Sequence, residues 1–186
     1  FIGIHFFSPV ERMGLVEIIS GEKTSEATLA KAVDYVLAIR KTPIAVNDSR
    51  GFYTSRCFGT YTREGMEMLA EGIKPAIIEN VGRQSGMPMG PLEVSDSVGL
   101  DTALKVARAT AEAMGVDIQS DQRAQFLGWL VEDQGRVGRK AGKGFYDYNE
   151  KGKPERLWPD LNTRIDVKVD ECPPELKKHY INRLLI

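Results

Sequence analysis

A polar, turn-rich segment at residues 47–51, Asn-Asp-Ser-Arg-Gly, divides the chain into two stretches of different periodicity. Before it, short apolar runs surround one amphipathic segment, which is the pattern of strands and a helix in an α/β sheet. After it, apolar residues recur at three- and four-residue spacing as far as about residue 134, which is typical of helices. The sequence therefore predicts a domain boundary here, with an α/β part at 1–48 and a helical domain at 49–148.

The α/β part contains three short apolar runs, at residues 1–7, 15–19 and 43–47. Runs of this length with few polar residues predict strands that are buried on both faces. Between the second and third runs, the spacing predicts a helix from a Thr24 cap to about Arg40, with a buried stripe formed by Leu29, Ala32, Val33, Val36 and Leu37. The order strand, strand, helix, strand predicts the end of a mostly parallel sheet, too small to be a domain by itself.

The helical part is predicted to contain helices at about 52–71, 75–84, 101–114 and 121–134, with a short helix within 87–99. An ordered, glycine-rich basic loop follows at 135–148. Residues 149–173 hold several prolines and little periodicity, so they are predicted to be a linker or an extended covering arm. A helix restarts at 174–186 as the truncated start of a second helical domain. Because the sequence starts in a strand-like run and stops in an apolar helical run, we expect both ends to be cut.

Two ionisable residues lie in the first two apolar runs, His5 in FIGIHFF and Glu17 in LVEII. Glu17 shares a strand face with Leu15 and Ile19, where a carboxylate needs a partner. A carboxylate beside an imidazole can fix its tautomer and stabilise the imidazolium that forms when it takes a proton. Such a pair suits removal of a hydroxyl proton while hydride leaves the same carbon. From spacing alone, the alternative stays open that the two residues are unrelated polar groups.

The composition gives no case for several classes of partner. The 25 basic residues nearly balance the 26 acidic ones, so no binding of nucleic acid or of an acidic membrane surface is predicted. The two cysteines, Cys57 and Cys172, are far apart and lack metal-ligand spacing, so neither a disulfide scaffold nor a metal site is predicted. No apolar run approaches the roughly 18 residues of a membrane span.

Four sequence blocks resemble, in order, the motifs of the 3-hydroxyacyl-CoA dehydrogenase family, especially the dehydrogenase part of multifunctional fatty-acid oxidation enzymes. The first is HFFSP followed by LVEII, with twelve positions from His5 to Glu17. The others are KTPIAVNDSRGFYTSR, GMPMGPLEVSDSVGLD and GRKAGKGFYDY. Together they cover about residues 1–148, and their order makes the resemblance more specific than any one block.

The resemblance implies a mainly α chain: the C-terminal remnant of a Rossmann-type α/β domain, followed by the all-helical C-terminal domain of this family. For a full-length parent it implies NAD-dependent oxidation of an L-3-hydroxyacyl-CoA to the 3-ketoacyl-CoA, as in fatty-acid β-oxidation. Two alternatives stay open. One is a helical dimerisation or structural module, and the other is a related two-domain dehydrogenase that acts on other hydroxyacids.

The resemblance also implies roles for individual residues. His5 would be the general base and Glu17 its orienting partner. Ser8 and Ser55 would contact the substrate, although Ser55 stands where many family members have Asn, so its shorter side chain would need a longer reach or a bridging water. Lys140 would approach the dinucleotide, whereas the residues alone allow equally that it is a solvated surface charge.

The implied cofactor is NAD, yet a GxGxxG fingerprint occurs nowhere in the sequence. We therefore expect the main NAD-binding determinants to be missing from these residues, and the fragment itself to be inactive. The resemblance further implies an acyl-CoA substrate, a homodimer formed through the helical domain and, in the parent, association with a thiolase subunit. A bacterial cytoplasmic location is expected, or a mitochondrial or peroxisomal one for a eukaryotic source.

Overall fold

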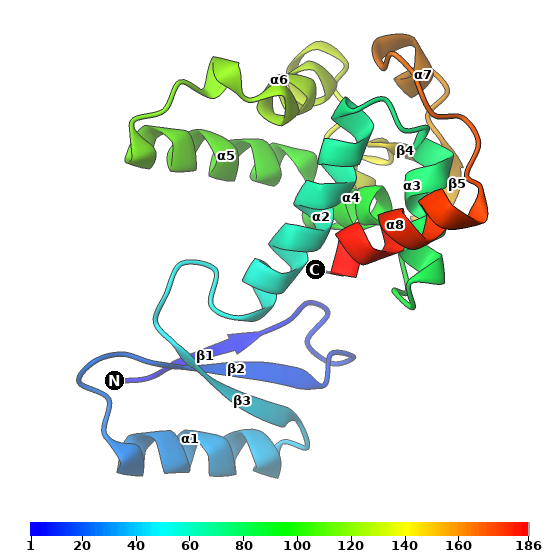
Figure 1. Cartoon of the computed structure of the whole chain (residues 1–186). Helices are drawn as coiled ribbons and strands as arrows, with labels where there is room; N and C mark the ends of the chain where they lie inside the picture. The colour runs from blue at the N-terminus through cyan, green and yellow to red at the C-terminus, as the bar shows by residue number, and fades with distance from the viewer. Residues whose placement is uncertain (186) are drawn as a thin grey trace. The chain divides into compact units, whose positions relative to one another are not determined.

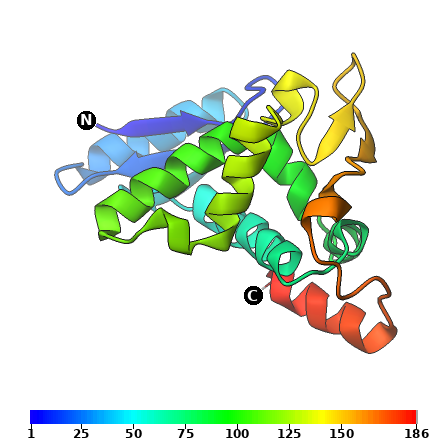
Figure 2. The same cartoon turned by 90° about the horizontal axis from the view of Figure 1, so that it is seen from above.

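A computed structural model describes residues 1–185, which form two compact units, Phe1–Gly59 and the residues from Thr60 onward (Figures 1 and 2). Ile186, the last residue of the predicted terminal helix, lies outside the described residues. Each unit has its own apolar core. Within residues 1–185, no helix combines the length and the apolar character needed to cross a membrane.

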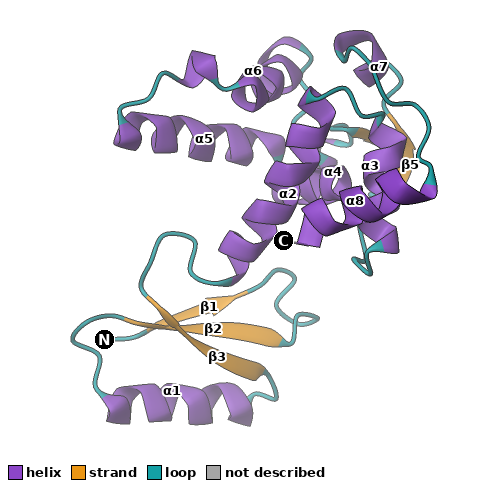
Figure 3. Ribbon diagram, viewed as in Figure 1, coloured by secondary structure: helices purple, strands orange, loops and turns teal. Residues whose placement is uncertain are grey.

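The first unit is a three-stranded sheet with one helix along it (Figure 3). Its elements are β1 (Gly3–Phe6), β2 (Leu15–Ser20), α1 (Glu26–Ala38) and β3 (Thr42–Asn47). β2 is the central strand, and it pairs antiparallel with β1 and parallel with β3. The predicted strands and helix are confirmed, with β1 and α1 shorter and β2 and β3 one residue longer than predicted. Only β2 is buried on both faces, because β1 and β3 are the edges of the sheet, and only one of the two strand pairings is parallel.

The core of the first unit lies between α1 and one face of β2. Ala32 and Val36 of α1 pack with Val16 and Ile18 of β2. Because successive residues of a strand face opposite sides, Glu17 points to the other face, where it is also fully buried. The sheet therefore has one apolar face under the helix and one face that buries a carboxylate.

Two predicted details of α1 are wrong. Leu37 is 55% exposed, because a helix turns by about 100° per residue and the stripe ends with its neighbour Val36. The cap is Ser25, whose side chain accepts a hydrogen bond from the N–H of Thr28. Thr24 instead donates its hydroxyl to the carbonyl of Phe1, a distant contact that the local sequence does not encode.

The second unit is mostly helical and includes a small hairpin (Figure 3). Its first helix starts within the first unit and continues into the second. The helices and strands are α2 (Thr54–Ala70), α3 (Pro75–Gln84), α4 (Pro91–Val98), α5 (Leu100–Met114), α6 (Gln122–Gly128), β4 (Tyr146–Tyr148), β5 (Pro154–Leu157), α7 (Leu161–Arg164) and α8 (Pro174–Leu185). Short 3₁₀ turns occupy Ile118–Ser120 and Arg139–Ala141.

The prediction of one continuous helix at 121–134 is wrong. The α-helix ends at Gly128, and Trp129–Asp133 forms a π-helical turn. Glycine weakens the helix at this point, and the Trp129 ring stacks on Trp158 with 5.5 Å between the ring centroids. This tertiary contact lies outside the range of a local pattern.

The apolar core of the second unit extends well past residue 148. Residues 149–173, predicted as a linker or an extended covering arm, contain β5 and α7, and Leu161 of α7 is fully buried. Tyr180 and Leu184 of α8 belong to the same core. Arg183 of α8 also forms ion pairs with Glu64 and Glu71.

Candidate active site

The register of the first sheet places His5 opposite Glu17. The two residues are direct cross-strand partners in the antiparallel pairing of β1 with β2, so their side chains lie on the same face. Nδ1 of His5 lies 2.8 Å from Oε2 of Glu17. The imidazole is 39% exposed, whereas the carboxylate is fully buried. The structure thus brings these two predicted residues together, with the imidazole as the accessible member.

The second oxygen of Glu17 is held by the start of α2. Oε1 accepts hydrogen bonds from the backbone N–H groups of Tyr53 (3.0 Å) and Thr54 (2.8 Å). The first N–H groups of a helix have no partner within it and favour a negative charge. Burial raises the pKa of Glu17, but the hydrogen bonds from the Thr54 N–H, from His5 and from the Tyr53 N–H outweigh it, so the pKa is lowered. Glu17 is therefore ionised at neutral pH.

An ionised carboxylate can only accept hydrogen bonds, so Nδ1 of His5 carries the proton and donates it to Glu17. In the neutral imidazole, Nε2 is then the acceptor. Aromatic rings flank the imidazole, with ring centroids 4.7 Å away for Phe7 and 5.8 Å away for Phe52. This arrangement can take up a proton at Nε2 and stabilise the resulting imidazolium through the buried carboxylate.

Ser8 and Ser55 lie in the same unit as this pair. Ser8 is exposed and lies two residues after the end of β1, and the Ser8–Pro9 peptide bond is cis. Ser55 is exposed in the first turn of α2. Neither hydroxyl is among the groups that hold Glu17. Their roles as substrate contacts stay predictions.

Lys140 lies in the second unit, exposed in the 3₁₀ turn of the glycine-rich basic loop. Asp96 of α4 holds this loop, because its carboxylate accepts the N–H groups of Phe145 (2.8 Å) and Tyr146 (2.9 Å). A Cβ atom at Gly144 would overlap the Asp96 carboxylate, so this glycine has a packing role. The role of Lys140 toward a dinucleotide stays a prediction.

Sequence reasoning missed several groups that shape the site. The N–H groups of Tyr53 and Thr54 leave no signal in the residue types, because every non-proline residue has such a donor. Phe52 did leave a signal, as an aromatic residue directly after Gly51 in the junction before a predicted helix. Asp96, which holds the loop that carries Lys140, left a weaker signal, as one of two acids with Glu93 in the predicted short helix LEVSDSV.

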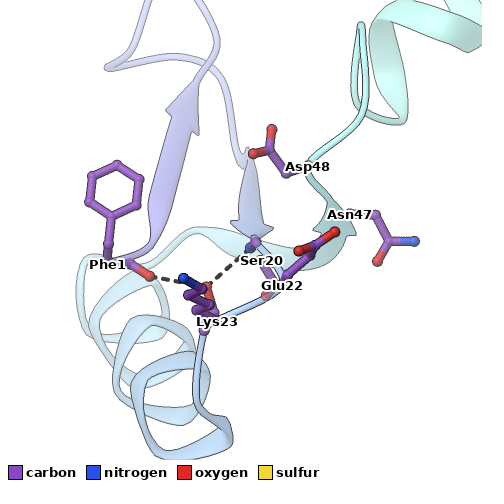
Figure 4. Close-up of a pocket in the computed structure, with 8 residues that line it drawn as sticks. Phe1, Ser20, Glu22, Lys23, Asn47 and Asp48 are labelled. Carbon is purple, nitrogen blue, oxygen red and sulfur yellow. Dashed lines mark hydrogen bonds between the residues drawn. The ribbon is translucent and has the colours of Figure 1, made fainter.

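A separate open hollow of about 720 Å³ lies at the carboxyl ends of β2 and β3 (Figure 4). Its lining includes Glu22, Lys23 and Asp48. It begins at Ser20, which lies about 10 Å along the strand from Glu17, and its lining does not include the pair. The lining side chains carry two carboxylates, of Glu22 and Asp48, and one ammonium group, of Lys23, which is a poor match for the phosphates of a dinucleotide.

Comparisons with known proteins assign both parts of the chain. The family model of the 3-hydroxyacyl-CoA dehydrogenase NAD binding domain matches residues 1–49. The family model of the 3-hydroxyacyl-CoA dehydrogenase C-terminal domain matches residues 51–148. The structure of (S)-3-hydroxybutyryl-CoA dehydrogenase from Ralstonia eutropha is similar, with 35% identity and a TM-score of 0.70, over 81% of this chain and 53% of that one.

Two further solved structures are similar. The 3-hydroxybutyryl-CoA dehydrogenase from Escherichia coli K12 has 29% identity and a TM-score of 0.68, over 84% of this chain and 33% of that one. The dehydrogenase part of multifunctional enzyme 1 from C. elegans has 25% identity and a TM-score of 0.65, over 99% of this chain and 41% of that one. The chain thus spans about half, or less, of the length of these structures. With family models matched on both sides of residue 50, the chain belongs to the 3-hydroxyacyl-CoA dehydrogenase family.

Proposed function

We propose that this chain is part of an NAD-dependent L-3-hydroxyacyl-CoA dehydrogenase, which oxidises the 3-hydroxyl group to a ketone. The observation that carries the proposal is the hydrogen bond between the accessible imidazole of His5 and the buried carboxylate of Glu17. The names of the relatives from R. eutropha and E. coli, both 3-hydroxybutyryl-CoA dehydrogenases, support this substrate class.

In the proposed reaction, Nε2 of His5 accepts the proton of the substrate hydroxyl. The hydrogen bond from Nδ1–H to Glu17 keeps the ring in the tautomer that can do this, and the carboxylate stabilises the imidazolium. Such proton transfer contributes roughly 10²–10⁴-fold to a rate. NAD, when bound, supplies the acceptor for the hydride that leaves the same carbon.

Three further residues have supporting roles in the proposal. The exposed hydroxyls of Ser8 and Ser55 contact the substrate. Because the Ser55 side chain is short, its contact spans a longer distance or passes through a bridging water. Lys140 meets a phosphate of the dinucleotide, since an exposed ammonium group on a well-held loop suits such a ligand.

The sequence contains no GxGxxG turn, so we expect the 186 residues on their own to bind NAD weakly and to be inactive. Isothermal titration calorimetry with NAD tests the first expectation. A dissociation constant in the low micromolar range would refute it.

We also propose a setting for the parent enzyme. The C. elegans protein, a dehydrogenase part of a multifunctional enzyme, matches 99% of this chain, which favours a multifunctional parent acting in fatty-acid β-oxidation. An acyl-CoA substrate, a thiolase partner subunit and a bacterial cytoplasmic location belong to the same proposal, with mitochondria or peroxisomes as the location for a eukaryotic source.

A chimera tests the central assignment. This chain replaces the matching segment of the R. eutropha enzyme, and NADH formation from 3-hydroxyacyl-CoA is followed by absorbance. We expect His5→Ala to lower turnover roughly 10²–10⁴-fold. His179→Ala is the matched control, because His179 is the only other histidine in the chain, and it should leave turnover unchanged. Retained turnover in His5→Ala would defeat the assignment.

A second function, self-association through the helical unit, is favoured by its exposed apolar side chains. Four of them lie on or beside α4 and α5, with exposures of 54–71%: Val98, Val106, Met114 and Val116. We expect a homodimer by light scattering after gel filtration, and a monomer after Val106→Asp with Met114→Asp. A strict monomer at high concentration would count against this function.

A further inference from the structure

The chain makes a strained turn between β3 and α2. Gly51 and Phe52 both have a positive φ angle, 78° and 45°. Glycine adopts this left-handed conformation readily, whereas a residue with a side chain pays about 1–2 kcal/mol for it. Among residues 1–185, Arg40 is the one other non-glycine residue with positive φ (60°). Strain of this kind is often held where it serves a site.

The turn directs backbone donors to Glu17. The N–H of Phe52 donates to the carbonyl of Ser49 at 3.0 Å and closes the turn. The next two N–H groups, of Tyr53 and Thr54, both donate to Oε1 of Glu17. The reversal at 51–52 therefore brings the start of α2 to a carboxylate that lies 36 residues earlier in the chain.

The turn also brings the Phe52 ring to the imidazole of His5, with centroids 5.8 Å apart and planes inclined by 54°. Phe7, two residues after His5 in sequence, supplies the other neighbouring ring at 4.7 Å. Glycine at position 52 would form the same turn without strain, but it would supply no ring. The strain at this position is thus accompanied by a contact that only the side chain can make.

We infer that Phe52 is a positioning residue of the pair formed by His5 and Glu17. The turn that it forms with Gly51 presents the N–H groups of Tyr53 and Thr54 to Glu17. The Phe52 ring limits rotation of the imidazole, so that Nδ1–H stays on the carboxylate. The catalytic consequence rests on the function proposed above. The hydrogen bond itself is measurable without any turnover.

Nitrogen-15 NMR of the histidine rings in the full chain tests this inference. With two histidines in the sequence, the signals of His5 and His179 can be assigned by substitution. We expect Phe52→Gly to populate the Nε2–H tautomer of His5 and to speed exchange of its Nδ1–H with water about tenfold, the equivalent of one lost hydrogen bond. Phe52→Tyr, which keeps a ring, should retain the wild-type signals.

Arg40→Gly is the matched control, because it removes the other strained non-glycine φ and leaves Phe52 in place; it should not change the His5 signals. If Phe52→Gly does not fold, Phe52→Leu carries the same test with apolar bulk retained. An unchanged tautomer and unchanged exchange in the folded variant would overturn the inference.

Loss of turnover in His5→Ala with unchanged NMR signals in Phe52→Gly would refute the positioning role alone. Retained turnover in His5→Ala with altered signals in Phe52→Gly would refute the proposed function alone.

Discussion

Glu17 in the first unit and Asp96 in the second are both buried carboxylates that accept two backbone N–H groups. They differ in their third donor. For Glu17 it is the imidazole of His5, which is 39% exposed. For Asp96 it is the hydroxyl of Tyr148 at 2.9 Å, and Tyr148 is itself buried. Glu17 can therefore stabilise the imidazolium that forms when the exposed His5 takes up a proton, whereas Asp96 forms hydrogen bonds only with buried groups.

The pKa directions separate the two residues further. Burial raises the pKa of Asp96 to about 6, because the hydrogen bonds from Phe145, Tyr146 and Tyr148 offset it only in part. For Glu17 the hydrogen bonds outweigh burial, and the pKa is lowered. The comparison teaches that a buried carboxylate with backbone donors is not itself a sign of catalysis. The third partner and its access to solvent decide between a proton-handling site and a structural contact.

The largest expected effect is on turnover, in Glu17→Gln of the chimera. The amide would donate to Nδ1 of His5 and leave the proton on Nε2, which can then no longer accept the substrate proton. We expect turnover to fall roughly 10²–10⁴-fold, while the free energy of unfolding falls by about 1 kcal/mol. NADH formation and urea unfolding measure the two. Unchanged turnover would mean that Glu17, like Asp96, makes only a structural contact.

The pH dependence of stability should have opposite signs in the two units. The raised pKa of Asp96 gives stability that is fully present below its unfolded value of 3.8 and is lost as the pH rises to about 6, at most about 3 kcal/mol. The lowered pKa of Glu17 gives stability that is present above its unfolded value of 4.5 and is lost as the pH falls through the folded value.

Urea unfolding from below pH 3.8 to above pH 6 measures how the free energy of unfolding changes with pH. It is compared for wild type, Asp96→Asn and Glu17→Gln. Both tryptophans, Trp129 and Trp158, lie in the second unit, so their fluorescence reports that unit, and amide hydrogen exchange reports the first. If the free energy of unfolding changed with pH in the same direction in both units, the contrast between Glu17 and Asp96 would be wrong.

A smaller effect is expected for Asp96→Asn at neutral pH. The new NH2 group replaces one carboxylate oxygen and must face a donor, the N–H of Phe145 or that of Tyr146, so we expect the second unit to lose about 2 kcal/mol. Asp101→Asn is the control, since the Asp101 side chain is 43% exposed and lies 3.7 Å from Lys105. The histidine tautomer in the first unit should not change; a change would mean that Asp96 also influences the pair.

The smallest effect is expected for Lys140→Ala. Because this side chain is exposed, stability should change by less than about 0.5 kcal/mol. In the chimera, the KM for NAD should rise a few-fold if the ammonium group meets a phosphate. Lys143→Ala, an exposed lysine of the same loop, is the matched control, and an equal rise in both variants would argue for general charge rather than a specific contact.

Local patterns predicted most of the fold. The three strands of the first unit follow from short apolar runs, and α1, α2, α3 and α5 from the 3.6-residue period of apolar residues, both of which a short window contains. The short helix α4 follows from the Pro and Gly residues that bound it. The wrong details, the Thr24 cap and the continuous helix at 121–134, depend on contacts with Phe1 and Trp158 that such a window omits.

The sequence by itself determined that a histidine and a glutamate lie in two neighbouring apolar runs, and its motifs pointed to the family that the comparisons show. Only the tertiary structure decided the state of the pair. The register sets His5 opposite Glu17, and the turn at Gly51–Phe52 precedes the two N–H groups that keep the buried carboxylate ionised. The physical reason is that desolvation and hydrogen bonding depend on neighbours in space, and for Glu17 these come from 12 and from 36 or 37 residues away in the chain.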